Sequence, residues 1–474
     1  MLNTAKIDSV LPNSEEDTNE PNIMTTHSPS KLPPQENHSI PPLILRSDPV
    51  HSPSVYPENH PIPPLILRSD PVHSPSVYPE NHPIPTLILR SGIVQHQLGQ
   101  YFTTNAVLKQ KVCEFILNNP DNILEPSIGQ GDLVQCIAET RPDIDFDMYE
   151  IDPTIKLLDN IPAESVIYCD FMQQTISKRY KTIVGNPPYV RTKTGNLYID
   201  FTEKCYHLLE PDGGELIFIV PSDFLKLTSA SKLLNKMMTT GTFTHIFHPN
   251  NERMFENASI DIIVFRYCNN PSIEKLVLYN GVQQYIKNRE GLITFGENAG
   301  ESAKFGDYFD VYVGMVTGKE EVYKNAELGN LSVLNGEDKI DRYIYIAKFP
   351  CYDERVNQYL LQHKPVLIDR KIRKFGEHNW FEWGALRNFT AINANMGRDC
   401  IYINTLTRKP AVAFAGKVTY FGGGLIMLIP KKTCNLNNIV AYLNSSEFKA
   451  NFTFSGRFKI GHRQICNSDF HSML

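Results

Sequence analysis

The chain has 474 residues, of which 41% are hydrophobic and 21% charged, and its formal net charge is −6. This composition is typical of a soluble protein, and the length is sufficient for two folded domains and an appendage. No apolar stretch reaches the roughly 18 residues that a membrane span requires, and residues 1–14 lack the layout of a secretion signal. We therefore expect a protein that is neither secreted nor membrane-bound. The average charge, taken alone, also argues against a nucleic-acid partner.

The nine cysteines stand singly along the chain. None forms the C-x-x-C pair or the Cys/His spacing of a structural zinc site, so we expect no bound metal. Unpaired cysteines of this kind favour a reducing compartment.

The first 91 residues differ in composition from the rest of the chain. They hold 18 of the 33 prolines, whereas all 27 glycines lie at or after Gly92. The 22-residue unit PPLILRSDPVHSPSVYPENHPI begins at Pro41 and again at Pro63, and a third copy opens at Pro85. Each unit carries six prolines and one short apolar patch, too little to bury a core, so we predict a disordered tail over 1–91. The alternative is a multivalent tail that presents the LILR copies to a partner.

The next region, residues 92–295, is predicted to form a doubly wound α/β domain. Short apolar stretches alternate with helix-like runs, which is typical of a buried and mostly parallel sheet. In such sheets the functional residues gather at the carboxyl ends of the strands. The expected strands are 122–125, 146–151, 166–169, 182–184, 215–220 and 260–267, and the expected helices include 105–117, 198–209 and 229–239.

Acidic residues end the first three predicted strands. In NILEPSIGQGDL, Glu125 ends the first strand, and two glycines then allow the backbone to approach a ligand closely. Glu150 in DMYEIDP ends the second strand and suits the two hydroxyls of a ribose, and Asp170 in CDF ends the third. Each acid alone is more often a solvated strand end. Three in succession after a glycine turn predict a site for a nucleoside-type cofactor.

The fourth strand runs into the motif IVGNPPYV, residues 183–190. Its prolines, Pro187 and Pro188, fix two φ angles and remove two backbone donors, so the bend is rigid and rich in acceptors. The Asn186 side chain and the Pro187 backbone each offer a carbonyl oxygen, and the ring of Tyr189 follows them. Two converging acceptors and a stacking ring are suited to holding a planar amino group.

At these residues the chain resembles the methyltransferases that use S-adenosylmethionine and act on amino nitrogens. Within that group it resembles the gamma-type N6-adenine DNA methyltransferases of restriction–modification systems. The order of the motifs is the same: YFTT, EPSIGQG, YEID, CDF and NPPY come before a target-recognition region, and the resemblance spans about residues 96–465. The resemblance implies a mostly parallel seven-stranded methyltransferase sheet over 92–295 and a mixed target-recognition domain over 296–474. The glycine motif lacks the family's frequent Cys-Gly-x-Gly form, which leaves its loop contacts open.

The resemblance also implies S-adenosylmethionine as the cofactor. Thr103 would meet the methionine carboxylate and Glu125 the ammonium, while Glu150 would bind the ribose hydroxyls. Asp170 would accept from the amino group of the cofactor's adenine, with hydrophobic side chains packed on the ring. The residues expected to contact the cofactor are Tyr101, Thr103, Glu125, Ser127, Gly129, Gly131, Glu150, Ile151, Asp170 and Phe171.

A flipped adenine is the implied substrate, because an adenine inside a duplex cannot reach such a pocket. The expected catalytic motif is Asn186-Pro187-Pro188-Tyr189, whose carbonyls would localise the lone pair of the amino nitrogen. Phe255, in RMFENASIDIIVF, is the candidate for a second aromatic wall around the base, and a core phenylalanine is the alternative. The chemistry requires neither a strong base nor a metal.

Positive charge is concentrated at the C-terminal end of the chain. From Arg342 onward, 19 Lys and Arg stand against 8 Asp and Glu, so the average of −6 conceals a basic region suited to tracking phosphates. Basic residues there mingle with aromatics and glycine turns, and a charge run such as 370–374 is more often a solvated face. The candidate DNA contacts are Lys319, Arg370, Lys371, Arg373, Lys374, Lys409, Arg457, Lys459 and Arg463.

The motifs are also compatible with other functions. The NPPY motif also occurs in RNA adenine and protein-glutamine methyltransferases, and a non-catalytic DNA-binding scaffold is a further alternative. The tail followed by a basic C-terminal region favours double-stranded DNA as the partner. We expect a cytoplasmic monomer of a bacterial or large-DNA-virus host, with a cognate restriction endonuclease as a further partner implied by the resemblance.

Overall fold

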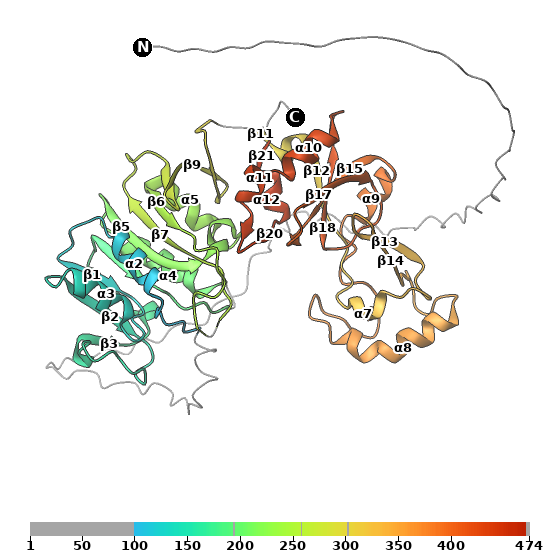
Figure 1. The fold of residues 1–474 in the computed structure, drawn as a ribbon. Coiled ribbons are helices and arrows are strands. Elements are labelled where there is room, and N and C mark those ends of the chain that lie inside the picture. Colours follow the sequence, from blue (N-terminus) through green and yellow to red (C-terminus); the bar gives the residue numbers. More distant parts are fainter. Residues whose placement is uncertain (1–98, 193–194, 257, 301–302, 471–474) are drawn as a thin grey trace, which may run out of the picture. The chain divides into compact units, whose positions relative to one another are not determined.

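The computed structural model describes residues 99–192, 195–256, 258–300 and 303–470 (Figure 1). The repeat tail predicted over 1–91 lies outside the described residues. The described residues belong to one compact unit, Pro85–Leu474, so the expected boundary at 295/296 stays a prediction. Within the described ranges, no helix has both the length and the apolar character needed to cross a bilayer.

A ten-stranded sheet organises the first half of the described chain (Figure 1), in the order β10-β9-β8-β6-β7-β5-β4-β1-β2-β3. The strands β1 to β5 run parallel to one another, whereas β7 lies antiparallel between β5 and β6. The predicted α/β class with a mostly parallel sheet is confirmed, but the expected count of seven strands is exceeded because β8 to β10 extend the edge at β6. The strands are β1 Asn122–Glu125, β2 Asp145–Glu150, β3 Val166–Tyr168, β4 Thr182–Gly185, β5 Gly214–Pro221, β6 Thr242–Phe247, β7 Ile262–Asn269, β8 Leu276–Tyr279, β9 Val282–Arg289 and β10 Leu292–Gly296.

Helices cover both faces of this sheet. Neighbouring strand residues point to opposite faces, so Ile217 packs with α2 and α3 while Leu216 and Phe218 pack with α4 and α5. Two hydrophobic cores result, one on each side of the central strands, as in a doubly wound fold. The helices are α2 Ala106–Phe115, α3 Asp132–Thr140, α4 Leu197–Leu208 and α5 Ser231–Thr240, with short 3₁₀ turns η1 Ala163–Ser165, η2 Phe171–Gln173 and η3 Ser222–Lys226.

The remaining chain forms small sheets with short helices. A four-stranded antiparallel sheet, β12-β18-β15-β17, supplies its main core, and the strands β16, β20 and β19 form a second small sheet. The strands are β11 Ala303–Lys304, β12 Phe309–Val313, β13 Leu331–Gly336, β14 Lys339–Tyr343, β15 Asp399–Asn404, β16 Leu406–Thr407, β17 Ala413–Lys417, β18 Leu425–Pro430, β19 Thr453–Phe454, β20 Arg457–Lys459 and β21 Asp469–Phe470. The helices are α6 Phe305–Tyr308, α7 Glu320–Tyr323, α8 Glu354–Ile368, α9 Phe389–Asn395, α10 Leu436–Leu443, α11 Ser446–Ala450 and α12 His462–Asn467.

Candidate active site

Polar side chains meet at the carboxyl ends of the first four parallel strands. Glu125 ends β1 and Glu150 ends β2, while Asn186 follows β4 directly and Asp170 is the second residue after β3. All but Glu125 line a cavity of about 300 Å³, and Glu125 lines a second cavity of about 30 Å³ that shares Asn186 and the glycine loop as walls. The parallel register of the strands brings these residues together, as the strand-end argument predicts.

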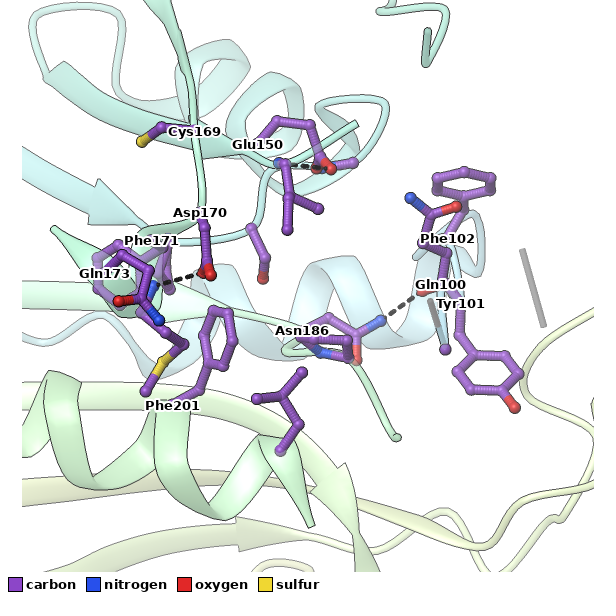
Figure 2. A pocket seen from close by; sticks show the side chains of 18 residues that line it. Gln100, Tyr101, Phe102, Glu150, Cys169, Asp170, Phe171, Gln173, Asn186 and Phe201 are labelled. Carbon is purple, nitrogen blue, oxygen red and sulfur yellow. Dashed lines mark hydrogen bonds between the residues drawn. The ribbon is translucent and has the colours of Figure 1, made fainter. Parts of the chain in front are cut away.

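The cavity wall contains most of the predicted cofactor residues and several that the sequence did not single out. None of the additional residues is charged, and two of them are phenylalanines. They come from the segment before α2, from the turn after β3 and from α4. Figure 2 shows Gln100 and Phe102 at one end and Phe201 and Gln173 at the other, with Asn186 between them. The residues missed from the sequence are Gly99, Gln100, Phe102, Cys169, Met172, Gln173, Leu197 and Phe201. Only their position relative to the strand ends identifies them.

Both glycines of the loop adopt a backbone conformation that favours glycine, and Gly131 also lacks the space for a side chain. Gly129 has φ +59° and Gly131 has φ +98°, a region that side-chain-bearing residues rarely adopt. A Cβ on Gly131 would also lie 2.7 Å from Ile161 Cγ1. Gly131 is the N-cap residue of α3, which begins at Asp132, so the loop turns from β1 into a helix beside the cavity.

The two glutamates are buried carboxylates with different partners. Glu150 accepts hydrogen bonds from the backbone N–H groups of Gly129 (2.9 Å), Ile151 (3.0 Å) and Asp152 (3.0 Å). Burial nevertheless raises the pKa of Glu150. Glu125 accepts only from Ser127 N–H (3.3 Å), and burial raises its pKa to about 8, with the negative charge of Glu150 contributing. Glu125 is thus held largely protonated at neutral pH, and a neighbouring cation would ionise it.

An aromatic end of the cavity lies beyond Asp170. The Asp170 carboxylate accepts from Met172 N–H (2.9 Å) and thereby caps the turn η2. Phe171 stacks on Phe201 with a centroid distance of 5.4 Å and an interplanar angle of 27°. Figure 2 shows Asp170 between these rings and the middle of the cavity. An acceptor beside stacked rings is suited to a purine that carries an amino group.

Asn186 lies at the middle of the site. Its Nδ2 donates to the Tyr101 carbonyl oxygen (2.6 Å; Figure 2) and to Thr103 Oγ1 (3.1 Å), which fixes the orientation of the amide. Its Oδ1 accepts from the Tyr189 hydroxyl (2.6 Å), and that hydroxyl also lies 3.1 Å from the Ile219 carbonyl oxygen. Because a hydroxyl has one proton, it can turn to Ile219 and leave Oδ1 free for another donor.

Three aromatic rings pack next to Asn186. Tyr101 lies 5.4 Å from Tyr189 and 5.6 Å from Phe255, and Tyr189 lies 6.2 Å from Phe255, measured between centroids. Phe255 is only 4% exposed and belongs to the core over α2 and α3. These rings fill the space beside the Asn186 acceptor, so a planar substrate would enter by separating them.

Two buried polar atoms at the cavity have no hydrogen-bond partner among the described residues. They are Gln100 Nε2 and Ser127 Oγ. Buried polar groups are normally paired, and unpaired ones are costly. Together with the carboxylates and the aromatic end, they fit a ligand that is polar along its length and carries an aromatic base. S-adenosylmethionine has this distribution of groups.

Similarity to known proteins is strongest in this part of the chain. Residues 149–255 match the Eco57I restriction-modification methylase family. The match begins just before Glu150 and ends at Phe255, so it includes Asp170 and the NPPY motif. The resemblance to restriction–modification methyltransferases is thereby confirmed.

Curated relatives agree with the Eco57I match. The type II methyltransferase M.HincII of Haemophilus influenzae is 27% identical over 224 residues, which cover 42% of this chain and 43% of that protein. The type II methyltransferase M.AccI of Acinetobacter calcoaceticus is 24% identical over 216 residues, covering 40% of this chain and 39% of that protein. The chain thus spans less than half the length of these relatives.

One solved structure extends the similarity in fold beyond the Eco57I match. The Type IIL restriction-modification enzyme MmeI, solved in complex with DNA, has a TM-score of 0.50 and 10% sequence identity. The alignment covers 79% of this chain and 65% of MmeI. At this identity the similarity concerns the fold alone.

The predicted DNA contacts divide into exposed and buried side chains. Arg370 is only 7% exposed, and its guanidinium donates to the carbonyl oxygens of Leu367, Thr317, Trp380 and Glu382 while lying 3.8 Å from the Phe375 ring. The expectation that Arg370 contacts DNA is therefore corrected, because every donor group serves the fold.

Arg463 is half-buried and stays a predicted DNA contact. Its Nε lies 3.3 Å from Thr228 Oγ1, and its two Nη atoms are buried with no hydrogen-bond partner among the described residues. Lys319 is half-buried and pairs with Glu321 (2.7 Å). The remaining candidates are exposed and stay predicted DNA contacts: Lys371, Arg373, Lys374, Lys409, Arg457 and Lys459.

Proposed function

We propose that this protein transfers a methyl group from S-adenosylmethionine to the N6 amino group of an adenine turned out of duplex DNA. The observation that carries the proposal is the position of Asn186, which lines the 300 Å³ cavity and whose side-chain oxygen accepts from Tyr189, a member of the aromatic cluster. The Eco57I match and the type II methyltransferase relatives support DNA as the substrate.

Each strand end would have a role in holding the cofactor. Glu150 would accept from the ribose hydroxyls, Asp170 from the purine amino group and Glu125 from the methionine ammonium. Ser127 Oγ and Gln100 Nε2 would gain the partners that they lack. When bound, S-adenosylmethionine supplies a methyl group on a positively charged sulfur, which is the electrophile of the reaction.

The protein contributes acceptors and position. Asn186 Oδ1 and the Pro187 carbonyl would accept from the two amino hydrogens of the base, which localises the nitrogen lone pair and stabilises the positive charge that develops there. Tyr101 O and Thr103 Oγ1 accept from Asn186 Nδ2 and so fix the orientation of the amide, whose Oδ1 would face the base. Tyr189 and Phe255 would enclose the base. After transfer the nitrogen loses a proton to solvent, so no strong base is needed.

A labelling experiment tests this function. The full chain is incubated with cofactor labelled in the methyl group and, separately, with plasmid DNA, total RNA and a protein extract. We expect label in DNA, located by sequencing as N6-methyladenine at a defined site. Label in RNA or protein alone would contradict DNA as the substrate. DNA binding without label in any arm would favour the non-catalytic scaffold.

The raised pKa of Glu125 predicts proton-linked cofactor binding. A carboxyl with a pKa of about 8 is mostly protonated at pH 6–7, whereas the ammonium of the ligand favours its ionised form. The affinity for S-adenosylhomocysteine should therefore rise with pH, by up to about tenfold per pH unit below pH 8, and then level off.

Calorimetry in buffers of different ionisation enthalpy measures this linkage directly. We expect the release of close to one proton per ligand at pH 7. In Glu125→Gln the binding should be weaker and the proton release should disappear. Equal proton release by both proteins would assign the linkage to another group, of which Glu150 is the nearest.

A further inference from the structure

Two arginines of the C-terminal region converge on one carboxylate of the methylase region. Arg408 follows β16, and Arg457 begins β20, which pairs with β16. Arg408 Nη2 lies 3.3 Å and Arg457 Nη2 3.9 Å from the same oxygen, Oε1 of Glu252. Both arginine side chains are about half exposed, at 53% and 46%, whereas Glu252 is 25% exposed.

Contacts other than the one with Glu252 also bring the arginine pair together. Arg408 Nη1 donates to the Ser455 carbonyl oxygen (3.0 Å) in the turn between β19 and β20. The pairing of β16 with β20 keeps the backbones that carry the two side chains adjacent. Two guanidiniums that share one carboxylate oxygen are placed to share one oxygen of a phosphodiester, and arginine is well suited to this ligand.

Glu252 also belongs to the segment that carries Phe255. The Glu252 carbonyl accepts from Ile260 N–H (2.8 Å), and its Oε2 accepts from Ser259 Oγ (3.1 Å). Three residues later, Phe255 packs on Tyr101 and Tyr189 beside Asn186. The contact with the arginines is therefore a tether between the C-terminal region and the aromatic wall of the active site.

We propose that Arg408 and Arg457 form a binding site for a DNA backbone phosphate and that Glu252 occupies this site until DNA arrives. The inference rests on the proposed function, because it requires duplex DNA as the partner. A phosphate that takes the two arginines displaces Glu252, and residues 248–256 then lose one tether. The ring of Phe255 can move away from Tyr189, which makes room for the base.

Other contacts keep the two regions joined when this tether opens. The Ser455 hydroxyl donates to the Asp261 carboxylate, and Lys459 Nζ lies 3.2 Å from Asp223 Oδ2. Neutralising Glu252 should therefore leave the fold intact. This separates the proposal from a purely structural ion pair, for which removal of Glu252 brings no gain in DNA affinity.

Binding of a labelled 30-base-pair duplex of random sequence, measured against salt concentration, tests the site. Glu252→Gln should bind the duplex about two- to fivefold more tightly than the unaltered protein, because the arginines are freed. Arg408→Gln and Arg457→Gln should each bind more weakly, by up to about eightfold at 0.1 M salt, with the slope of log affinity against log salt reduced by about one.

The matched control is Asp399→Asn. Asp399 pairs with the exposed Lys417 in the same region (2.8 Å), so the variant changes the net charge equally without touching the proposed site. If Asp399→Asn tightens binding as much as Glu252→Gln does, the effect is general charge and the proposal is overturned. It is also overturned if the arginine variants keep the full salt slope.

Hydrogen exchange of residues 248–256 tests the link to the active site. Exchange should increase when the duplex is added, and Glu252→Gln should show the increase without DNA. Unchanged exchange in both cases would contradict the tether. If the unaltered protein binds no duplex at all, the proposed function fails first; if it binds duplex but Glu252→Gln binds no more tightly, only this inference fails.

Discussion

Replacing Asn186 by alanine should abolish methyl transfer while cofactor binding is largely retained. The variant removes the side-chain carbonyl acceptor of the motif, and loss of one such preorganised group typically costs about 10²–10³-fold in rate. We expect a fall of at least this size in single-turnover transfer to DNA, with the affinity for S-adenosylhomocysteine changed much less. Near-normal turnover would refute the role of Asn186.

Asn186 also anchors its surroundings, so a second variant is needed. Its Nδ2 holds the Tyr101 carbonyl and Thr103 Oγ1, and alanine loses these contacts as well. Asn186→Asp keeps an oxygen at the Oδ1 position but loses the Nδ2 donor. If catalysis depends on the acceptor oxygen at the Oδ1 position, Asn186→Asp should retain more methyl transfer than Asn186→Ala. The matched control is Asn122→Ala. Asn122 begins β1, so it lies at the amino end of the strand and away from the site at the carboxyl ends, and the variant should be active.

Replacing Glu150 by glutamine should produce the largest loss of cofactor affinity. The carboxylate is expected to accept from both ribose hydroxyls, and hydrogen bonds to a charged acceptor contribute about 1.5–3 kcal/mol each. Two such bonds correspond to a loss of about 3–6 kcal/mol, or about 10²–10⁴-fold in affinity. Titration calorimetry with S-adenosylhomocysteine measures this loss.

The Glu150 change also affects the free protein, so thermal unfolding of the variant is measured beside the calorimetry. Burial raises the pKa of Glu150, which favours a neutral side chain. Glutamine, however, keeps only one oxygen for the three backbone N–H groups and turns its Nε2 donor toward at least one of them. The matched control is Asp152→Asn, because Asp152 is close in sequence but pairs with Thr154 and does not line the cavity. Equal losses in the two variants would show that the loop, rather than the Glu150 acceptor, determines affinity.

Local patterns predicted the central strands well and the sheet edge poorly. The expected 122–125 coincides with β1, because NILE is a short buried run. The strand β6, Thr242–Phe247, was missed because Thr244 and His245 interrupt its apolar pattern. The hairpin β9–β10 is missed for a similar reason, since β9 is mostly polar and has one buried residue. Buried parallel strands have a composition of their own, whereas partly exposed strands such as β6 and β9 mix polar with apolar residues.

Charge runs in the basic region were less informative than motifs. The residues from Arg370 to Lys374 are nearly all basic. Arg370 is nevertheless buried and donates to the backbone carbonyls of Trp380 and Glu382, whereas Lys371 is exposed. The burial of a side chain depends on which residues from distant parts of the chain pack against it. The local sequence around a basic residue therefore does not predict whether that residue is exposed. The tether between Arg408 and Glu252 likewise joins residues 156 positions apart.

The sequence alone determined the α/β class and the positions of Glu125, Glu150, Asp170 and Asn186 at strand ends, because short buried apolar runs and the rigid Pro-Pro bend are local properties. The tertiary structure decided which side chains complete the site. It brings Tyr101, Tyr189 and Phe255 into one cluster and places the Tyr189 hydroxyl where it donates a hydrogen bond to Asn186 Oδ1. It also set the protonation of Glu125, because burial and the neighbouring Glu150, rather than the residue itself, raise that pKa.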